Sequence, residues 1–230
     1  MRNGVSYHSR SQTPARLRLA GGEFGNEIYF FFYAKSMKSR TIKTIIEQQT
    51  FTGIDFSKNG FPKDDYENCS FLNCNLSNAD LSGIKFIECT FRGCNLSVSK
   101  LDGTTFRDAH FVDCKLSGMQ FGNCNEILFS VDFENCNLTL ASFYALNVKK
   151  TRFKNCILHE VDFTQSDLSG SLFDNCDFAR AKFDRTNLIK TDLRNSYNYS
   201  IDPEENKVKK AKFSAVGIIG LLGKYDIDVE

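Results

Sequence analysis

Large apolar residues recur at every fifth position of this chain from Phe51 onward. The first series runs to Phe121, and after a slip of two positions a second series runs from Leu128 to Leu193. Nearly all of these positions are Phe or Leu, and the residue two positions before each is usually small. A period of five matches neither the turn of a helix nor the alternation of a strand. The pattern therefore predicts a chain that turns every five residues.

The pattern also repeats after every four of these five-residue sides, as it would if four sides closed one coil. One column contains only Phe and another contains only Cys. These columns are Phe71, Phe91, Phe111, Phe133, Phe153, Phe173 and Cys74, Cys94, Cys114, Cys136, Cys156, Cys176. Coils stacked at the ~4.8 Å spacing of neighbouring strands would bury both columns. We therefore expect an all-β solenoid of about seven coils.

The short stretches FENCNL, FRGCNL, NADLSG and FTQSDLSGSLFDNCDF carry a family resemblance. They resemble the pentapeptide-repeat family, and the resemblance covers residues 51–196. It implies a right-handed quadrilateral β-helix over that range. It implies no particular activity, because the family's motif is specific for fold and not for function.

The N-terminal flank breaks the repeat. Residues 1–36 contain several Arg and no acidic residue before Glu23, followed by the apolar run Ile28 to Tyr33. We expect a disordered extension; a targeting segment and translation from a start upstream of Met37 remain open. Residues 37–50 are expected to lead into the solenoid as its N-terminal cap.

The C-terminal flank, residues 197–230, is expected to cover the open end of the solenoid as a short helical cap, because a terminal coil exposes core residues and strand edges. It resembles the C-terminal element of the quinolone-resistance, microcin-immunity and albicidin-resistance branch at Asp202, Pro203, Glu204, Asn206, Gly217, Leu221, Leu222, Ile227 and Val229. That resemblance implies a homodimer. The expected interface residues are Val216, Ile218, Ile219, Leu221, Leu222, Tyr225 and Ile227.

Composition narrows the function classes. The chain has 230 residues with a formal net charge of +1, which argues against a polybasic nucleic-acid binder, so we expect no direct nucleic-acid binding. No apolar run approaches the length of a bilayer crossing, which predicts no membrane span. The 9 Cys include no CxxC pair, and only 3 His accompany them. We therefore predict structural thiols in a reducing, cytoplasmic compartment, with no metal site and no cofactor.

Charged residues offer few chemical candidates. Subtracting one coil places Asp132 beside Arg152 and Glu134 beside Lys154, which predicts cross-coil charge pairs on the outer surface. His110 and His159 fall at outward positions beside inward centres. No nucleophile has a plausible His or carboxylate partner, and no glycine-rich phosphate loop is present. The sequence predicts a protein that is not an enzyme.

Two functions remain open. The quinolone-resistance resemblance implies a rod that a type II topoisomerase, DNA gyrase or topoisomerase IV, accepts in place of DNA. Residues 51–200 hold 16 basic and 19 acidic side chains, a poor copy of a duplex, which carries about one charge per 1.7 Å. Candidate contacts are the acidic face Asp80, Asp102, Asp162 and Asp184, and the register slip at Asn123, Asn125 and Glu126. The alternative is a scaffold for an unrelated protein partner.

Overall fold

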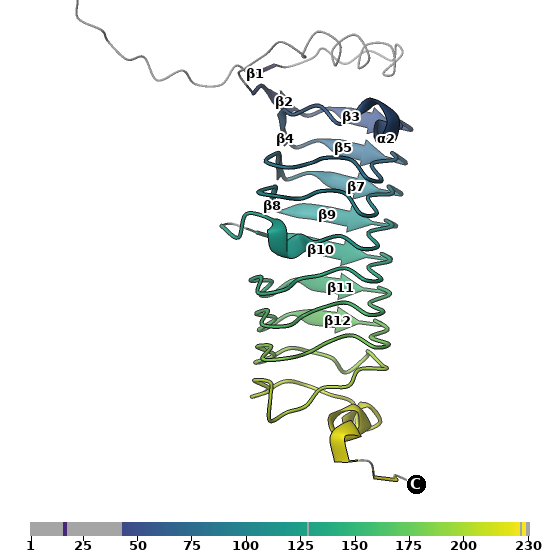
Figure 1. The fold of residues 1–230 in the computed structure, drawn as a ribbon, viewed down its shortest axis with the longest axis vertical. Coiled ribbons are helices and arrows are strands. Elements are labelled where there is room, and N and C mark those ends of the chain that lie inside the picture. The colour runs from purple at the N-terminus through teal and green to yellow at the C-terminus, as the bar shows by residue number, and fades with distance from the viewer. Residues whose placement is uncertain (1–15, 18–42, 128, 226, 229–230) are drawn as a thin grey trace, which may run out of the picture.

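The computed structural model describes residues 16–17, 43–127, 129–225 and 227–228. They form a rod of stacked coils, with the solenoid strands one above another along its axis (Figure 1). A five-stranded parallel sheet and a seven-stranded parallel sheet line two sides of the described rod. The first contains β1 (Arg16–Leu17), β2 (Ile45–Glu47), β4 (Asp65–Glu67), β6 (Lys85–Ile87) and β8 (Thr105–Arg107). The second contains β3 (Thr50–Thr52), β5 (Ser70–Leu72), β7 (Thr90–Arg92), β9 (Ala109–Val112), β10 (Val131–Glu134), β11 (Arg152–Lys154) and β12 (Leu172–Asp174).

The register confirms the predicted four-sided coil. Phe71 pairs with Phe91 and Phe91 with Phe111, each in a parallel ladder. The next partner is Phe133, one coil and two extra positions further on, and the regular step then resumes at Phe153. The two extra positions are thus absorbed by a loop without disturbing the column, as the sequence predicted.

We name the four sides of the coil by their inward columns. Face A follows Ile46, Tyr66, Phe86 and Phe106, and continues after the loop at Val148, Leu168 and Leu188. Face B follows Phe51, Phe71, Phe91, Phe111, Phe133, Phe153 and Phe173. Face C follows Leu76, Leu96, Leu116, Leu138, Leu158 and Phe178, and face D follows Leu81, Leu101, Phe121, Phe143, Phe163 and Phe183. All of these side chains are buried.

The polar residues of the repeat make the corners. The second residue after most centres has a positive φ, as at Asn73 (52°) and Gly83 (68°), a backbone conformation that Gly and Asn adopt most readily. The residue before a centre is often Asn or Asp, and its side chain caps the turn. The Asn75 Oδ1 atom, for example, accepts a 3.1 Å hydrogen bond from the Ser77 backbone N–H. Faces C and D, and the C-terminal half of face A, pair through single bridges instead of extended strands.

The core is a stack of rings and small polar side chains. The Phe71 and Phe91 rings stack with centroids 4.8 Å apart, and Phe91 meets Phe106 of the neighbouring column edge-on. All nine Cys are buried and free. The Cys94 thiol donates to the Phe71 carbonyl at 3.2 Å, as the Ser99 hydroxyl donates to the Leu76 carbonyl at 2.7 Å. Where this position holds Cys or Ser, the polar hydrogen reaches a carbonyl of the preceding coil; elsewhere apolar side chains such as Ile84 and Val161 fill it.

The parallel ladder extends beyond both ends of the predicted range 51–196. β2 already pairs with β4, so part of the predicted lead-in 37–50 is a strand of the sheet. At the other end, the bridges Asn187↔Lys207 and Asp192↔Lys212 add one more partial coil. The Phe/Leu pattern fades there because Ile46 and Val208 occupy the inward positions. Of the predicted extension 1–36, all but 16–17 lies outside the described residues.

Helical turns interrupt or end the solenoid. The first coil contains α2 (Phe56–Asn59), and the register slip begins with the 3-10 turn η2 (Phe121–Asn123). The cap consists of the 3-10 turns η3 (Gly217–Leu221) and η4 (Gly223–Tyr225), in agreement with the predicted short helical cap. A Cβ atom at Gly220 would overlap the backbone carbonyl oxygen of Tyr199, so this glycine lets η3 approach the last coil.

Candidate functional site

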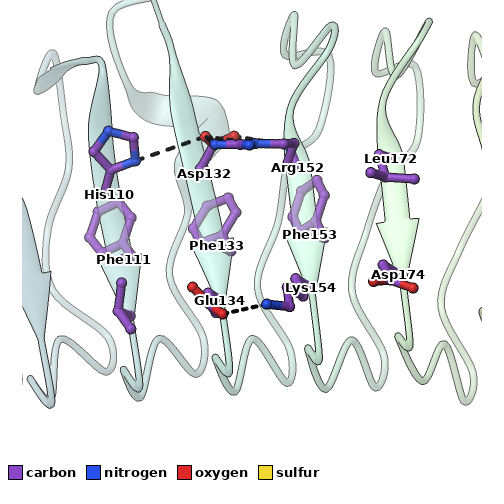
Figure 2. Close-up of a pocket in the computed structure, with 11 residues that line it drawn as sticks. His110, Phe111, Asp132, Phe133, Glu134, Arg152, Phe153, Lys154, Leu172 and Asp174 are labelled. Atoms are coloured by element: carbon purple, nitrogen blue, oxygen red, sulfur yellow. Dashed lines mark hydrogen bonds and ion pairs between the residues drawn. The ribbon is translucent and has the colours of Figure 1, made fainter.

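The outer surface of face B is a ladder of charge pairs. The Arg152 guanidinium lies 2.8 Å from the Asp132 carboxylate, and the Lys154 ammonium lies 2.8 Å from the Glu134 carboxylate. Both pairs join residues in direct register, as the subtraction of one coil predicted. Figure 2 shows the two rows side by side across a shallow depression of about 290 Å³. In its lining, Arg152 and Lys154 are each paired with an acid of the preceding coil, while Asp174 forms no ion pair within the described residues.

The two predicted surface histidines also face carboxylates. His110 Nδ1 lies 3.8 Å from Asp132 Oδ2, and His159 Nε2 lies 2.8 Å from Asp177 Oδ2. Burial raises the pKa of Asp177, but the hydrogen bonds with His159 and Asn198 outweigh it and leave the pKa below its usual value. These contacts join successive coils and account for both imidazoles as structural partners.

Two thiols in the middle of the Cys column, those of Cys94 and Cys114, have little nucleophilic character. A hydrogen bond with Cys114 and burial together raise the pKa of Cys94 to about 12, and a hydrogen bond with Cys136 and burial do the same for Cys114. Such thiols are uncharged at neutral pH. Among the described residues no group of three or more His, Cys, Asp or Glu side chains could hold a metal ion.

The four predicted partner-binding aspartates lie together on face D. Asp80 and Asp162 belong to one outward column, which they share with Lys100 and Lys182. The neighbouring column, on the other side of the inward centres, contains Asp102 and Asp184; the Asp102 carbonyl accepts from the Gly83 N–H of the coil before, and the Asp184 carbonyl accepts from the Gln165 N–H. The structure thus brings the four carboxylates to one face as two pairs, each pair in successive coils, with two coils without an acid between the pairs.

Each of these carboxylates has a local partner. Asp80 lies 2.9 Å from Lys63, and Asp184 lies 2.8 Å from Arg185. Asp102 accepts a 2.9 Å hydrogen bond from Asn123, and Asp162 accepts one from the Thr164 backbone N–H. Hydrogen bonds from Ser82 and Lys63 lower the pKa of Asp80 to about 2. This carboxylate is ionised at neutral pH, with much of its charge compensated by the adjacent lysine.

The register slip forms a loop that protrudes from the rod beside β10 (Figure 1). Asn123, Asn125 and Glu126 lie on it and all three are exposed, Asn123 as the last residue of the turn η2. The most exposed large apolar side chain here is Ile127, at 74%, which our sequence reasoning did not select. The signal was available, because Ile127 belongs to neither register. Phe129 packs against the core, with its ring 6.3 Å from that of Phe121, while Leu128 lies outside the described residues.

The predicted dimer segment divides into two groups. Val216 is 80% exposed, and Ile218, Ile219 and Ile227 are about half exposed. Leu221 instead packs against the core, and Leu222 is half-buried, so both help to seal the last coil. Tyr225 is exposed, but its hydroxyl lies 3.2 Å from a Glu204 carboxylate oxygen. Four of the seven residues therefore present free apolar surface.

One basic group was missed. Steps of whole coils connect Lys149 and Lys150 with Lys190, Lys209 and Lys210, but our sequence reasoning did not group them. All are exposed on the C-terminal half of face A. In the described part of the chain, no helix has both the length and the apolar character that a membrane crossing requires.

Comparisons with known proteins agree with this architecture. No curated protein sequence matches the chain. A trypsin-treated variant of QnrB1, a plasmid-mediated fluoroquinolone resistance protein, superposes with a TM-score of 0.51 at 21% identity over 95% of this chain and 100% of its own. Full-length QnrB1 gives 0.41 at 24% identity over 80% and 100%. HetL of Nostoc sp. strain PCC 7120, a pentapeptide repeat protein involved in heterocyst differentiation regulation, gives 0.36 at 17% over 79% and 92%.

The QnrB1 variant with the TM-score of 0.51 shares the fold at low identity, and the match of the sequence to a family model is more direct. The family model described as a pentapeptide repeat region matches residues 64–125 and 126–216. Together these two segments span most of the described solenoid. With its five-residue period, its four-sided coil and this match, the chain belongs to the pentapeptide repeat family.

Proposed function

We propose that this protein is a non-enzymatic rod that binds a type II topoisomerase, DNA gyrase or topoisomerase IV, and protects it from quinolone-like inhibitors. The observation that carries the proposal is the placement of Asp80, Asp102, Asp162 and Asp184 on one face of a straight solenoid. Face D then occupies part of the enzyme's DNA-binding surface in place of a duplex.

The charge density of face D limits how closely it imitates DNA. A duplex carries about one charge per 1.7 Å of axis, or roughly three per ~4.8 Å coil step. Face D carries fewer than one aspartate per coil, and Lys100 and Lys182 stand between them. The shape and hydrogen-bonding groups of the rod must therefore contribute alongside charge. We expect binding that weakens steeply with salt and that a long duplex can displace.

The test is a gyrase supercoiling assay with a fluoroquinolone and purified full-length protein. The variant Asp80→Asn, Asp102→Asn, Asp162→Asn, Asp184→Asn removes four charges. At Asp80 and Asp162, whose carboxylates cap their turns, Asn keeps the cap as Asn75 and Asn95 do. It should lose protection. The matched control removes four acids from faces A and B: Glu67→Gln, Glu88→Gln, Asp108→Asn, Asp174→Asn. Equal loss in both variants, or no effect of the wild type on gyrase, would refute the proposal.

The second candidate is a scaffold for another protein partner. The observation that favours it is charge compensation: on face B acids and bases face each other across coils, and on face D lysines share the acidic column. A scaffold would leave gyrase and topoisomerase IV unaffected at every protein concentration. That outcome separates the two candidates.

We also propose that two rods join through the C-terminal cap and that the protein works in the cytoplasm. Exposed Val216 and Ile218 support the dimer, since apolar side chains grouped at one end of the rod favour association. The nine free thiols support the cytoplasmic location, because thiols stay reduced in that compartment. Light scattering should give twice 26.1 kDa, and Val216→Glu with Ile218→Glu should halve the mass. Val98→Glu, at an exposed apolar position of the solenoid corner, is the control; a monomeric wild type would contradict the dimer.

A further inference from the structure

The C-terminal half of face A carries a group of lysines that we call the lysine ridge: Lys149, Lys150, Lys190, Lys207, Lys209 and Lys210. Bridges Asn147↔Asp167, Asp167↔Asn187 and Asn187↔Lys207 set successive coils in register along this face. Backbone hydrogen bonds from Lys150 to Ser169 and from Lys190 to Lys209 continue the same stack. The ridge therefore runs along the rod axis over three coil steps, or ~14 Å.

The ridge lacks the compensation found elsewhere. Lys149 lies 3.2 Å from Asp167. Within the described residues the other five lysines are exposed and form no ion pair with a carboxylate. On face B, by contrast, Arg152 and Lys154 each face an acid of the preceding coil. Five uncompensated charges thus lie close together in a chain whose formal net charge is only +1.

The backbone holds these charges in a fixed array. Lys150, Lys190 and Lys210 are corner residues with φ values of 58°, 60° and 60°, so their side chains leave the rod in equivalent directions. Gly170 occupies the corner between Lys150 and Lys190, where an added Cβ atom would meet Lys150 Cγ at 3.6 Å. Like charges in adjacent coils destabilise a ladder. The array thus does nothing for folding, which points to a role in binding an anion.

The chemistry of the ridge favours phosphate over a protein surface. Protein interfaces are poor in Lys and rich in aromatic residues and Arg, whereas the ridge consists of Lys with half-buried Ile189 beside it. Lys binds phosphate as a point charge, without the fork geometry that reads bases or carboxylates. The ridge itself contains no aromatic side chain on which an unpaired base could stack. A duplex backbone, contacted without regard to sequence, fits these features best.

We propose that the lysine ridge binds the phosphate backbone of double-stranded nucleic acid without sequence preference. This inference is independent of the topoisomerase proposal, since it concerns another face and the opposite charge. It departs from the expectation of no direct nucleic-acid binding, which was drawn from the net charge. In the net charge of the whole chain, the lysines of the ridge are cancelled by acids on other faces. With about five phosphate contacts, the logarithm of the affinity should fall against the logarithm of salt concentration with a slope of about −4.5.

The experiment is fluorescence anisotropy of a labelled 20-base-pair DNA titrated with the full chain. Between 50 and 200 mM salt we expect the affinity to fall roughly 500-fold. The variant Lys190→Gln, Lys207→Gln, Lys209→Gln, Lys210→Gln should reduce the slope to about −1. The matched control removes four other cations that form no ion pair among the described residues: Lys100→Gln, Arg107→Gln, Lys115→Gln, Lys182→Gln. It should keep the steep slope.

Several outcomes would overturn the proposal. The first is the absence of binding at 50 mM salt up to about 10⁻⁴ M protein. The second is an equal loss of slope in the control, which would assign binding to net charge alone. The third is ridge-dependent binding of polyglutamate or of phosphatidylserine vesicles without binding of DNA, which would assign the ridge to an acidic protein or a membrane. Circular dichroism checks folding, and Lys150→Gln with Lys190→Gln replaces the larger variant if that one unfolds.

Discussion

The interior of the rod repeats almost unchanged from coil to coil, whereas its outer faces change at every level. Phe133 and Phe153 stack with ring centroids 4.9 Å apart. Their sequence neighbours Asp132 and Arg152 point outward in the same register with opposite charges. One backbone thus carries two independent sets of positions. The inward set specifies the fold, and the outward set is free to differ between faces, which is where any partner must be recognised.

The largest effect is expected from a cavity in the interior, which tests whether the inward residues determine the stability of the fold. Phe133→Ala in the middle of the rod should lower the free energy of unfolding by about 3–5 kcal/mol, because the site is fully enclosed and cannot collapse. Chemical denaturation followed by circular dichroism measures it. Phe133→Leu, which restores a side chain found at other centres, should cost less than about 1.5 kcal/mol. Similar values for the two substitutions would mean that the interior is not tightly packed.

The cap should be sensitive to substitution where η3 packs on the last coil, although much of its surface is exposed. Gly220→Ala places a methyl group against the Tyr199 carbonyl and should cost about 1–3 kcal/mol through overpacking. Gly223→Ala is the control, because its added atom would meet only the Ser200 hydroxyl at 3.4 Å. Thermal unfolding of both variants compares them. Equal stability would show that η3 does not dock closely on the last coil.

The buried thiols should resemble hydroxyls in their role. Cys114→Ser should change the free energy of unfolding by about 1 kcal/mol or less, because Ser99 and Ser171 make the same hydrogen bond to a carbonyl of the preceding coil. Ellman's reagent at pH 7 should react with the native wild type only after denaturant is added. Rapid labelling of the native protein would contradict the burial of these side chains.

The smallest effect belongs to a surface pair. The hydrogen bond with Arg194 lowers the pKa of Asp192 to about 2, from an ordinary value near 3.8. A lowered pKa stabilises the fold above about pH 4, and this contribution disappears as the pH falls toward 2. Asp192→Asn should therefore be less stable than wild type at pH 6, by less than about 1 kcal/mol, with no difference below pH 2. A constant difference across melts at several pH values would exclude the ionised pair as its cause.

The sequence predicted the interior well because every inward position obeys one spacing. The same arithmetic predicted the pairs of Asp132 with Arg152 and of Glu134 with Lys154. It did not predict α2, or the docking of η3 on Tyr199, because these contacts lie at the ends, where the repeat no longer applies. It also missed Lys190 and Lys210, since net charge was counted along the chain and not along a face. Local spacing determines the coils, but the surface pattern appears only after the coils are stacked.

The return of every column after four sides has a consequence for how such a protein changes length. Removing one full coil, for example from Cys136 to Asn155, brings Asn135 next to Cys156 and leaves each remaining column continuous. Removing half a coil, which is two of the four sides, would keep the inward residues inward. Each face before the deletion would then be continued by the opposite face after it, so that face A would be followed by face C. The rod can therefore gain or lose length only in whole coils of ~4.8 Å if each of its faces is to stay continuous. Partner sites on one face keep their alignment while the distance between them is adjusted.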